Sequence, residues 1–391
     1  MSDNLSKPSI PKTVWVLGWV SLLMDISSEM IHALLPLFMV NTLGAGMIWI
    51  GLVEGVGEGA ALVTKVFSGA IADRFGHKKW LVFTGYFLGV ISKPLFALAT
   101  AMPIVLGARF LDRIGKGMRG APRDAIVAEV TDEKIRGAAY GLRQSLDAAG
   151  AFVGPLLATV LLLFWTQDLR TLFWVALIPG AACLMLIIMG VENREIKTQT
   201  ARPLSFQDYR EVFTSAFKQL LILGVVFSMA RFSNAFIVLR ADDIGVVQTW
   251  IPLLMVLMNA VFSFASYPFG KLADRISASK LLSLGLIFLA LSDMTFAFCS
   301  NLAGLLLAIV LFGLHLAATQ GILAAMVSRA APSHLRATAF GVFNLFSGLA
   351  LLFCGLISGA LWQMWGAQVS FLFAGLFALL SLLLTRVFRL L

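Results

Sequence analysis

The chain has 391 residues, of which 59% are hydrophobic and 13% are charged, and its mean hydropathy is +0.89. A soluble domain carries about a quarter charged residues, so this composition excludes a soluble globular protein and indicates that lipid surrounds most of the chain. The formal net charge of +9 would suit a nucleic-acid partner, but the placement of the basic residues argues against one.

Apolar stretches long enough to cross a hydrocarbon core of about 30 Å recur along the whole chain. The first dozen residues are polar and lack a small-residue cleavage site, so we expect no cleaved signal peptide. The pattern predicts an all-α integral membrane protein with twelve transmembrane helices, of which the fourth is the least apolar. The predicted spans are 13–40, 46–71, 79–100, 103–120, 135–164, 168–190, 218–240, 246–270, 278–299, 301–327, 335–363 and 367–388.

Lysine and arginine predict the orientation of these spans. Most of them fall in loops on the side shared by both chain ends, whereas Arg170 and Arg240 fall on the other side. Because cytoplasmic loops carry the excess of basic residues, both termini and the 191–217 segment are predicted to be cytoplasmic. The basic charge then reflects membrane topology, and we expect no nucleic-acid partner.

Two loop sequences recur about 200 residues apart, which indicates a duplicated scaffold. GAIADR at 69–74 corresponds to GKLADR at 270–275, and RGAAYG at 136–141 corresponds to RATAFG at 336–341. The repeat predicts two pseudo-symmetric six-helix bundles, at 1–190 and 218–391, joined by the 191–217 linker. Transporters built from such repeats bind their substrates near the membrane midplane, between the two halves.

At these loops the sequence resembles the major facilitator superfamily, and the resemblance covers essentially the whole chain. The family signature G-x-x-x-D-R-x-G-x-K-K is met by Gly69, Asp73, Arg74, Gly76, Lys78 and Lys79. Its second copy is degraded: Asp274 and Arg275 remain, but Ser277 replaces a glycine. Gly154-Pro155 in the fifth span is similar to the family's antiporter motif. The stretches 25–31, 109–125 and 266–275 look like a bacterial branch whose substrates are poorly defined.

The resemblance implies the major-facilitator fold and a gate that closes the cytoplasmic side. The gating residues that it indicates are Gly69, Asp73, Arg74, Gly76, Asp274, Arg275, Gly154 and Pro155. A purely topogenic basic loop between the second and third spans is the alternative.

Ionisable residues inside the spans are costly in lipid and are therefore candidates for function. Asp25, Glu29 and His32 share one face of the first span, and Glu54 and Glu58 lie on the second. We expect Asp25, Glu29, Glu54 and Glu58 to couple transport to protons, because a buried acid beside a cation can titrate near working pH.

Basic residues on the neighbouring spans are the candidate substrate contacts. A guanidinium pairs bidentately with carboxylate or phosphate, which favours Arg109 and Arg113. The full predicted set is Arg109, Arg113, Lys116, Arg143, Asp147, Arg231 and His32. A static charge network remains the alternative for these residues. We further expect Lys65 and Lys93 to snorkel near helix ends, and we place Arg119, Arg123, Asp124, Glu129, Asp132 and Glu133 in a solvated loop.

Motifs for other chemistry do not support an enzyme. GKGMRG at 115–120 matches a dinucleotide fingerprint literally but lacks the strand–turn–helix context. No Walker motif or clustered Cys/His is present, and the three cysteines lie in apolar runs, so neither a cofactor nor a metal is expected.

The sequence therefore predicts a monomeric, multi-pass carrier of the bacterial inner membrane, with the lipid bilayer as its surroundings. It would move a small organic anion by proton-coupled alternating access. A multidrug:proton antiporter that exports amphipathic compounds is the alternative. Phe227, Phe232, Phe236, Phe262 and Phe264 are candidates to wall a substrate cavity, although plain packing is the interpretation that their pattern favours.

Overall fold

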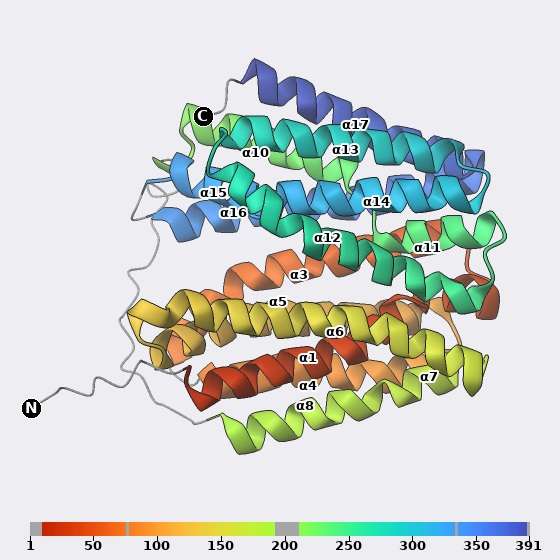
Figure 1. Ribbon diagram of the computed structural model, residues 1–391, viewed down its shortest axis with the longest axis horizontal. Helices are drawn as coiled ribbons and strands as arrows, with labels where there is room; N and C mark the ends of the chain where they lie inside the picture. The colour runs from red at the N-terminus through yellow and green to blue at the C-terminus, as the bar shows by residue number, and fades with distance from the viewer. Residues whose placement is uncertain (1–9, 76–77, 192–210, 333–334, 389–391) are drawn as a thin grey trace, which may run out of the picture.

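The computed structural model describes residues 10–75, 78–191, 211–332 and 335–388, and within these ranges it contains helices and turns but no strand. The long helices lie side by side and run along the longest axis of the molecule, which is horizontal in Figure 1. We call the end at which α1 starts with Lys12, α4 starts with Lys78 and α17 ends after Arg386 the basic end, and the other the opposite end.

The first half begins with α1, which continues through a short helix and a π-helical turn. Its elements are α1 (Lys12–His32), α2 (Leu35–Leu37), η1 (Phe38–Thr42), α3 (Met47–Phe75), α4 (Lys78–Ala97), α5 (Met102–Val130), η2 (Glu133–Ile135), α6 (Arg136–Phe164), α7 (Leu169–Val175) and α8 (Leu177–Gly190).

The second half repeats this course, with two of its crossings broken. Its elements are α10 (Ser215–Ala230), α11 (Asn234–Asp243), η3 (Gln248–Trp250), α12 (Ile251–Ala273), α13 (Ala278–Phe298), α14 (Leu302–Thr319), α15 (Ile322–Ala330), α16 (Arg336–Trp365) and α17 (Ala367–Val387). Gly321 takes the left-handed conformation, with φ of +77°, at the break between α14 and α15.

Local capping explains where several helices begin. The side chains of Asp168, Ser233, Ser277 and Asn301 accept hydrogen bonds from the first backbone N–H groups of α7, α11, α13 and α14. These N–H groups have no partner inside the helix, so a side-chain oxygen before it stabilises the helix start.

Eleven described spans are long and apolar enough to cross a membrane. The twelfth crossing is α5, which the charges on it keep below that level of hydropathy. It crosses inside the protein, where Arg109, Asp112, Arg113 and Arg119 are all buried. The twelve-helix, all-α fold predicted from the sequence is thereby confirmed.

The predicted end of the fourth span at residue 120 is wrong, because α5 continues to Val130. The solvated-loop prediction is also wrong for Arg119 and Arg123, and Asp124 and Glu129 lie on α5 rather than in a loop. Arg119 is buried with its guanidinium 4.5 Å from the centre of the Tyr86 ring. Arg123 donates hydrogen bonds to Ser21 (2.9 Å) and Tyr86 (3.2 Å). Aromatic and hydroxyl partners on α1 and α4 therefore replace water for these two cations.

Glycines bring the two halves together along α3 and α16. A Cβ on Gly55 would lie 2.8 Å from the carbonyl oxygen of Leu352, and one on Gly59 would lie 3.0 Å from that of Gly348. Gly51 and Gly355 make the same kind of backbone contact further along. Residues without a side chain are what permit two helices to approach this closely.

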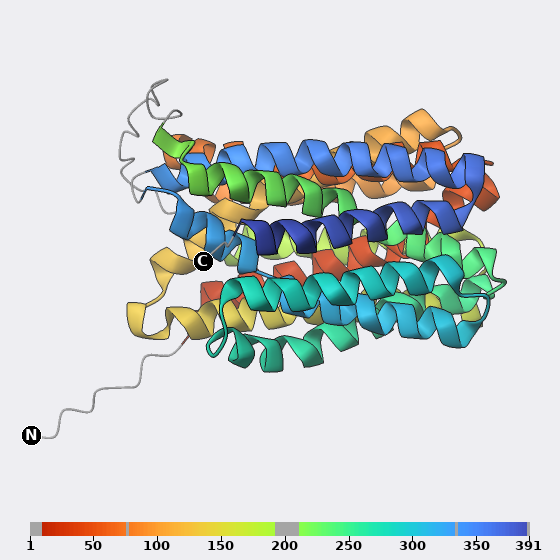
Figure 2. The same cartoon turned by 90° about the horizontal axis from the view of Figure 1, so that it is seen from above.

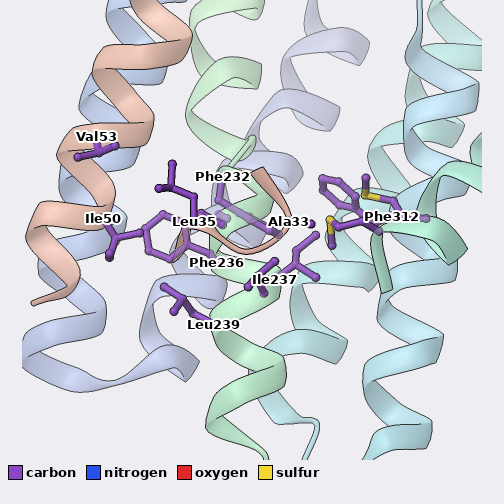
Figure 3. Packing of buried hydrophobic residues seen from close by; sticks show 14 of the residues in the cluster. Ala33, Leu35, Ile50, Val53, Phe232, Phe236, Ile237, Leu239 and Phe312 are labelled. Carbon is purple, nitrogen blue, oxygen red and sulfur yellow. The ribbon is translucent and has the colours of Figure 1, made fainter. Parts of the chain in front are cut away.

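Apolar side chains from both halves close the opposite end. Leu35 and Ile50 of the first half lie beside Phe236 of the second in one buried cluster (Figure 3). Polar links cross the same end, from Gln363 to the backbone N–H of Ile48 (3.2 Å) and from Gln167 to Thr249 (3.5 Å). Seen from above, α16 and α10 lie at one side of the bundle and α12 at the other (Figure 2).

Candidate functional site

A cavity of ≈ 600 Å³ lies between the two halves. It is lined by helices of both halves, from Glu29 and His32 on α1 to Leu351 on α16. Leu62, Leu323 and Phe343 line its part nearer the basic end. Eight residues predicted from the sequence line it: Glu29, His32, Glu54, Glu58, Arg109, Arg113, Lys116 and Arg231.

Two carboxylates of α3 pair with two arginines of α5 at the cavity wall. Arg109 donates to Glu54 Oε2 at 2.7 Å, and Arg113 Nη1 lies 3.2 Å from Glu58 Oε1. Gly57 makes room for both, since a Cβ there would lie 3.1 Å from Arg109 Cγ and 3.3 Å from Arg113 Cγ. The spacing of four residues on each helix aligns the two pairs in adjacent turns.

A second charged group lies behind this wall. Lys93 on α4 has no solvent-exposed surface, and it donates at 3.0 Å both to Asp112 Oδ1 on α5 and to Ser28 Oγ on α1. The prediction that Lys93 snorkels is therefore wrong. A buried ammonium needs a charge partner within the protein, and Asp112 supplies it.

His32 connects the buried pair to the cavity. Its Nε2 lies 3.3 Å from Asp112 Oδ2, and its Nδ1 lies 3.5 Å from Glu29 Oε1. The contact with Asp112 is close but does not have hydrogen-bond geometry. The imidazole thus lies between a carboxylate in the protein interior and one at the cavity surface.

Two cations of the cavity lack an ion pair in the part of the chain that the structure describes. Lys116 on α5 and Arg231, at the break between α10 and α11, are both exposed to the cavity. The guanidinium of Arg231 lies 5.8 Å from the centre of the ring of Phe227, which is in the last turn of α10. These two side chains come from opposite halves. Unlike Arg109 and Arg113, they are not paired with a carboxylate in the described structure.

The second half contributes aromatic rings rather than charge. Phe227, Phe232, Phe262, Phe312 and Phe343 line the cavity. The predicted Phe236 and Phe264 do not: Phe236 is buried in the apolar closure, and Phe264 is 83% exposed on the outside of α12.

Ser233 links the halves at the centre and was not foreseen from the sequence. It donates to Glu54 Oε2 at 2.7 Å, so Glu54 is held by Arg109 of its own half and by Ser233 of the other. The predicted span 218–240 ran across this position as one helix. The pair Ser233-Asn234 is a helix-start signal that would have indicated the break.

Three predicted residues lie outside the cavity lining. Asp25 faces α6, where a Cβ on Gly150 would lie 2.9 Å from Asp25 Cβ. Arg143 and Asp147 of α6 lie nearer the basic end, where Arg143 Nε is 3.5 Å from Asp124 Oδ1 and Arg143 Nη1 is 3.8 Å from Asp147 Oδ1. Their predicted roles in transport stay predictions.

The predicted gating residues fall in three places. Gly154 and Pro155 are buried in α6 against α1, where a Cβ on Gly154 would lie 3.0 Å from Glu29 Cβ. Asp274 and Arg275 are exposed after α12. Gly69, Asp73 and Arg74 belong to the last turns of α3, where the structure describes the backbone but not the side chains, and Gly76 lies outside the described residues.

Asp293 on α13 is a further buried carboxyl, in the second half. It has no exposed surface, and neither of its oxygens has a hydrogen-bond partner among the described residues. His315 on α14 is equally buried and binds the carbonyl oxygen of Gly285 through Nδ1 (2.9 Å). Neither is among the residues that line the cavity.

Comparison with known proteins decides the family. The family model of the Major Facilitator Superfamily matches residues 17–254 and 220–391. The chain belongs to the Major Facilitator Superfamily. The family predicted from the loop motifs is therefore confirmed, and with it a multi-pass membrane protein of a transporter family.

Relatives and solved structures agree with this membership. An uncharacterized MFS-type transporter of Methanocaldococcus jannaschii is 30% identical over 388 residues, which is 98% of this chain and 96% of that protein. Multidrug resistance protein MdtH of Proteus mirabilis is 34% identical over 131 residues, 32% of each chain. A POT family transporter, crystallised with a thioalcohol-conjugated peptide, superposes with a TM-score of 0.82 over 97% of this chain and 96% of that one, at 16% identity.

Proposed function

We propose that this protein is a secondary active transporter that moves a small organic anion across the membrane by proton-coupled alternating access. The observation that carries the proposal is the pair of cavity cations without an ion pair in the described structure, Lys116 and Arg231. An anion that bridges them would contact both halves at once. A ligand shared in this way favours the state in which the two halves are closed around it.

Proton coupling is supported by the carboxylates of the cavity. Glu29, Glu54 and Glu58 line it, and each lies close to a basic side chain or His32. Protonation of one of them would free its partner for the substrate anion, which links proton binding to substrate binding. Asp25, which we also expect to carry protons, has Asp147, Lys116, Arg119 and Glu29 as charged neighbours.

Alternating access is supported by the difference between the two ends of the molecule in how the halves contact each other. Apolar and polar contacts join the halves at the opposite end, while the cavity extends toward the basic end. We assign this arrangement to the state open toward the basic end, with bundles 1–190 and 218–391 as the moving units. The basic end would face the cytoplasm of a bacterial inner membrane, with both termini inside, because basic residues mark that side.

The test is transport into liposomes with an imposed pH gradient. Purified protein is first screened by thermal shift against aromatic and aliphatic carboxylates, and the best radiolabelled hit is then used for uptake. Gradient-driven accumulation that collapses on adding a protonophore supports the proposal, and flux that no gradient changes rejects the coupling.

Matched variants locate the coupling group. Glu29→Gln, Glu54→Gln and Glu58→Gln are compared with Glu133→Gln, whose side chain is 87% exposed at η2. At least one cavity variant should keep counterflow exchange yet lose gradient-driven accumulation, and Glu133→Gln should keep both. If all three cavity variants and Asp25→Asn still accumulate substrate, protons enter elsewhere.

A multidrug:proton antiporter is the second candidate. The match to MdtH over about a third of the chain and the aromatic lining favour it. An exporter of this kind would lose activity when Phe227 or Phe262 is changed but not with Arg231→Gln, whereas an organic-anion carrier would lose activity with Arg231→Gln.

A further inference from the structure

The cavity is chemically divided between the two halves. The first half lines it with Glu29, His32, Glu54, Glu58, Leu62, Arg109, Arg113 and Lys116, which are all polar or charged except Leu62. The second half lines it with five phenylalanines, the aliphatic side chains of Met258, Leu316, Leu323 and Leu351, several small or amide side chains and one cation, Arg231. A ligand that fills this space therefore meets charge on one side and rings on the other.

The arginines of the first half are already engaged. Arg109 and Arg113 are buried and pair with Glu54 and Glu58. The atoms Nε and Nη1 of Arg109, which have no hydrogen-bond partner in the described structure, are themselves buried. A ligand anion would have to displace a carboxylate to reach either arginine.

Lys116 and Arg231 present no such obstacle. Both side chains are exposed and lack an ion pair in the described part of the chain. Arg231 also follows the last turn of α10, where its N–H donates to the carbonyl oxygen of Ser228 (3.2 Å), so its backbone position is defined. An anionic group can therefore bind here without breaking an existing ion pair.

Phenylalanines on the aromatic side of the cavity pack against one another and against neighbouring rings. Phe232 stacks on Phe312 with ring centres 5.5 Å apart, and it meets Phe371 edge-to-face at 5.0 Å. Figure 3 shows Phe232 and Phe312 within the buried cluster to which both halves contribute. A preformed aromatic surface binds an apolar group with little cost in side-chain ordering.

We propose that the substrate is an amphipathic organic anion that carries an aromatic or alicyclic group, with its anionic end on Arg231 and Lys116 and its ring on the phenylalanine wall. This deepens the proposed function and rests on it. Small hydrophilic anions would leave the aromatic side unfilled, and a cation would meet Arg231 and Lys116. The volume of ≈ 600 Å³ suits one drug-sized molecule.

The experiment measures binding of four probes of similar length to the full-length protein in nanodiscs by calorimetry. These are 4-phenylbutanoate, octanoate, 4-phenylbutanol and 4-phenylbutylamine. We expect 4-phenylbutanoate to bind about tenfold tighter than each of the others, since it alone makes both kinds of contact. Equal binding of octanoate overturns the aromatic part of the inference, and tighter binding of 4-phenylbutylamine overturns the anionic part.

Variants separate the two sides of the site. Arg231→Gln should weaken the binding of 4-phenylbutanoate about tenfold and leave the binding of 4-phenylbutanol unchanged. Phe262→Leu should weaken the binding of 4-phenylbutanoate more than that of octanoate. The matched controls are Lys271→Gln, an exposed cation at the end of α12, and Phe264→Leu, an exposed ring two residues from Phe262. Controls as damaging as the cavity variants would overturn the assignment.

These outcomes are distinct from failure of the proposed function. If pH-driven uptake occurs with octanoate as readily as with 4-phenylbutanoate, the proposal of an organic-anion carrier is supported and the proposed preference for an aromatic group is contradicted. If 4-phenylbutanoate binds as expected but no pH gradient alters its flux, the proposed substrate class is supported and the proposed proton coupling is contradicted.

Discussion

Lys93 and Asp112 form an ion pair of 3.0 Å in the interior of the first half, and neither side chain has appreciable contact with solvent. Ser28 and His32 complete the surroundings of this pair from α1. The pair therefore ties α4 to α5 and both helices to the wall of the cavity.

Removal of one partner should destabilise the protein more than removal of both. Asp112→Leu leaves a buried ammonium without a carboxylate, which costs about 3–5 kcal/mol. The double variant Lys93→Met/Asp112→Leu leaves no buried charge of this pair, so most of that loss should be recovered. The measurement is the free energy of unfolding in detergent, arranged as a double-mutant cycle.

The control for this cycle is Lys280→Met, which removes an exposed lysine at the start of α13. It should change the free energy of unfolding by less than about 0.5 kcal/mol. Additive losses in the double variant would show that Lys93 and Asp112 do not depend on each other.

Two glycine-to-alanine substitutions should change the unfolding temperature in opposite directions. A Cβ on Gly55 would lie 2.8 Å from the carbonyl oxygen of Leu352, whereas a Cβ on Gly107 has nothing within 4 Å. Gly107→Ala should raise the unfolding temperature, because alanine is favoured over glycine in a helix by about 1 kcal/mol. Gly55→Ala should lower it, and should lower transport, because α3 and α16 are forced apart.

Thermal unfolding of the two variants in parallel, with uptake measured on the same samples, tests this pair. An increase in unfolding temperature for Gly55→Ala would contradict the close crossing of α3 and α16.

The helix count and the charged first half could be read from the sequence, because hydropathy and positions on a helix face follow directly from residue order. The end of α5 could not. Arg119 and Arg123 have the residue types of a solvated loop, and the sequence does not place Tyr86 and Ser21, on other helices, beside them.

Which charged side chains pair with one another likewise could not be predicted from the sequence. A spacing of four residues places Glu54 with Glu58 and Arg109 with Arg113 on common faces, but it does not say which faces meet. Arg143 and Asp147 had the same spacing as the cavity residues and lie elsewhere, since α6 turns this part of its surface toward Arg123 and Asp124. Partners across helices depend on tertiary packing, which residue spacing does not contain.

The hydrogen bond from Ser233 to Glu54 should hold the two halves in their present relation. Ser233→Ala removes it and should shift the population toward the state in which the opposite end is open. A cysteine at Thr249, which is 7% exposed at the contact with Gln167, reports this opening. We expect Thr249→Cys to react several-fold faster with a membrane-impermeant thiol reagent in the Ser233→Ala background.

Ser292→Ala is the matched control, because it removes a buried serine hydrogen bond (2.8 Å to Ala308) that stays within the second half. It should leave the labelling rate unchanged. Faster labelling in both backgrounds would point to general loosening rather than to the contact between the halves.

Asp168 caps α7 at the opposite end, and its contribution should depend on pH. The hydroxyl of Thr171 (2.7 Å) and the backbone N–H groups of Arg170 and Thr171 (3.1 Å each) donate to the Asp168 carboxylate. These donors favour the charged form, with the Thr171 hydroxyl as the largest cause, and lower the pKa of Asp168 below its usual 3.8. The stabilisation is therefore complete above the pKa of the unfolded chain and is lost as the pH falls through the lower folded value.

At pH 7 we expect Asp168→Ala to cost about 1 kcal/mol of stability, as for other N-cap residues. Asp168→Asn should cost less, since an amide oxygen still accepts from the helix start. The difference between the native protein and Asp168→Asn should stay constant from pH 8 to about pH 5 and shrink below about pH 4, where the carboxylate takes up a proton. Thermal unfolding across this pH series measures it, and a difference that grows on acidification would show that the carboxylate does not act as the cap.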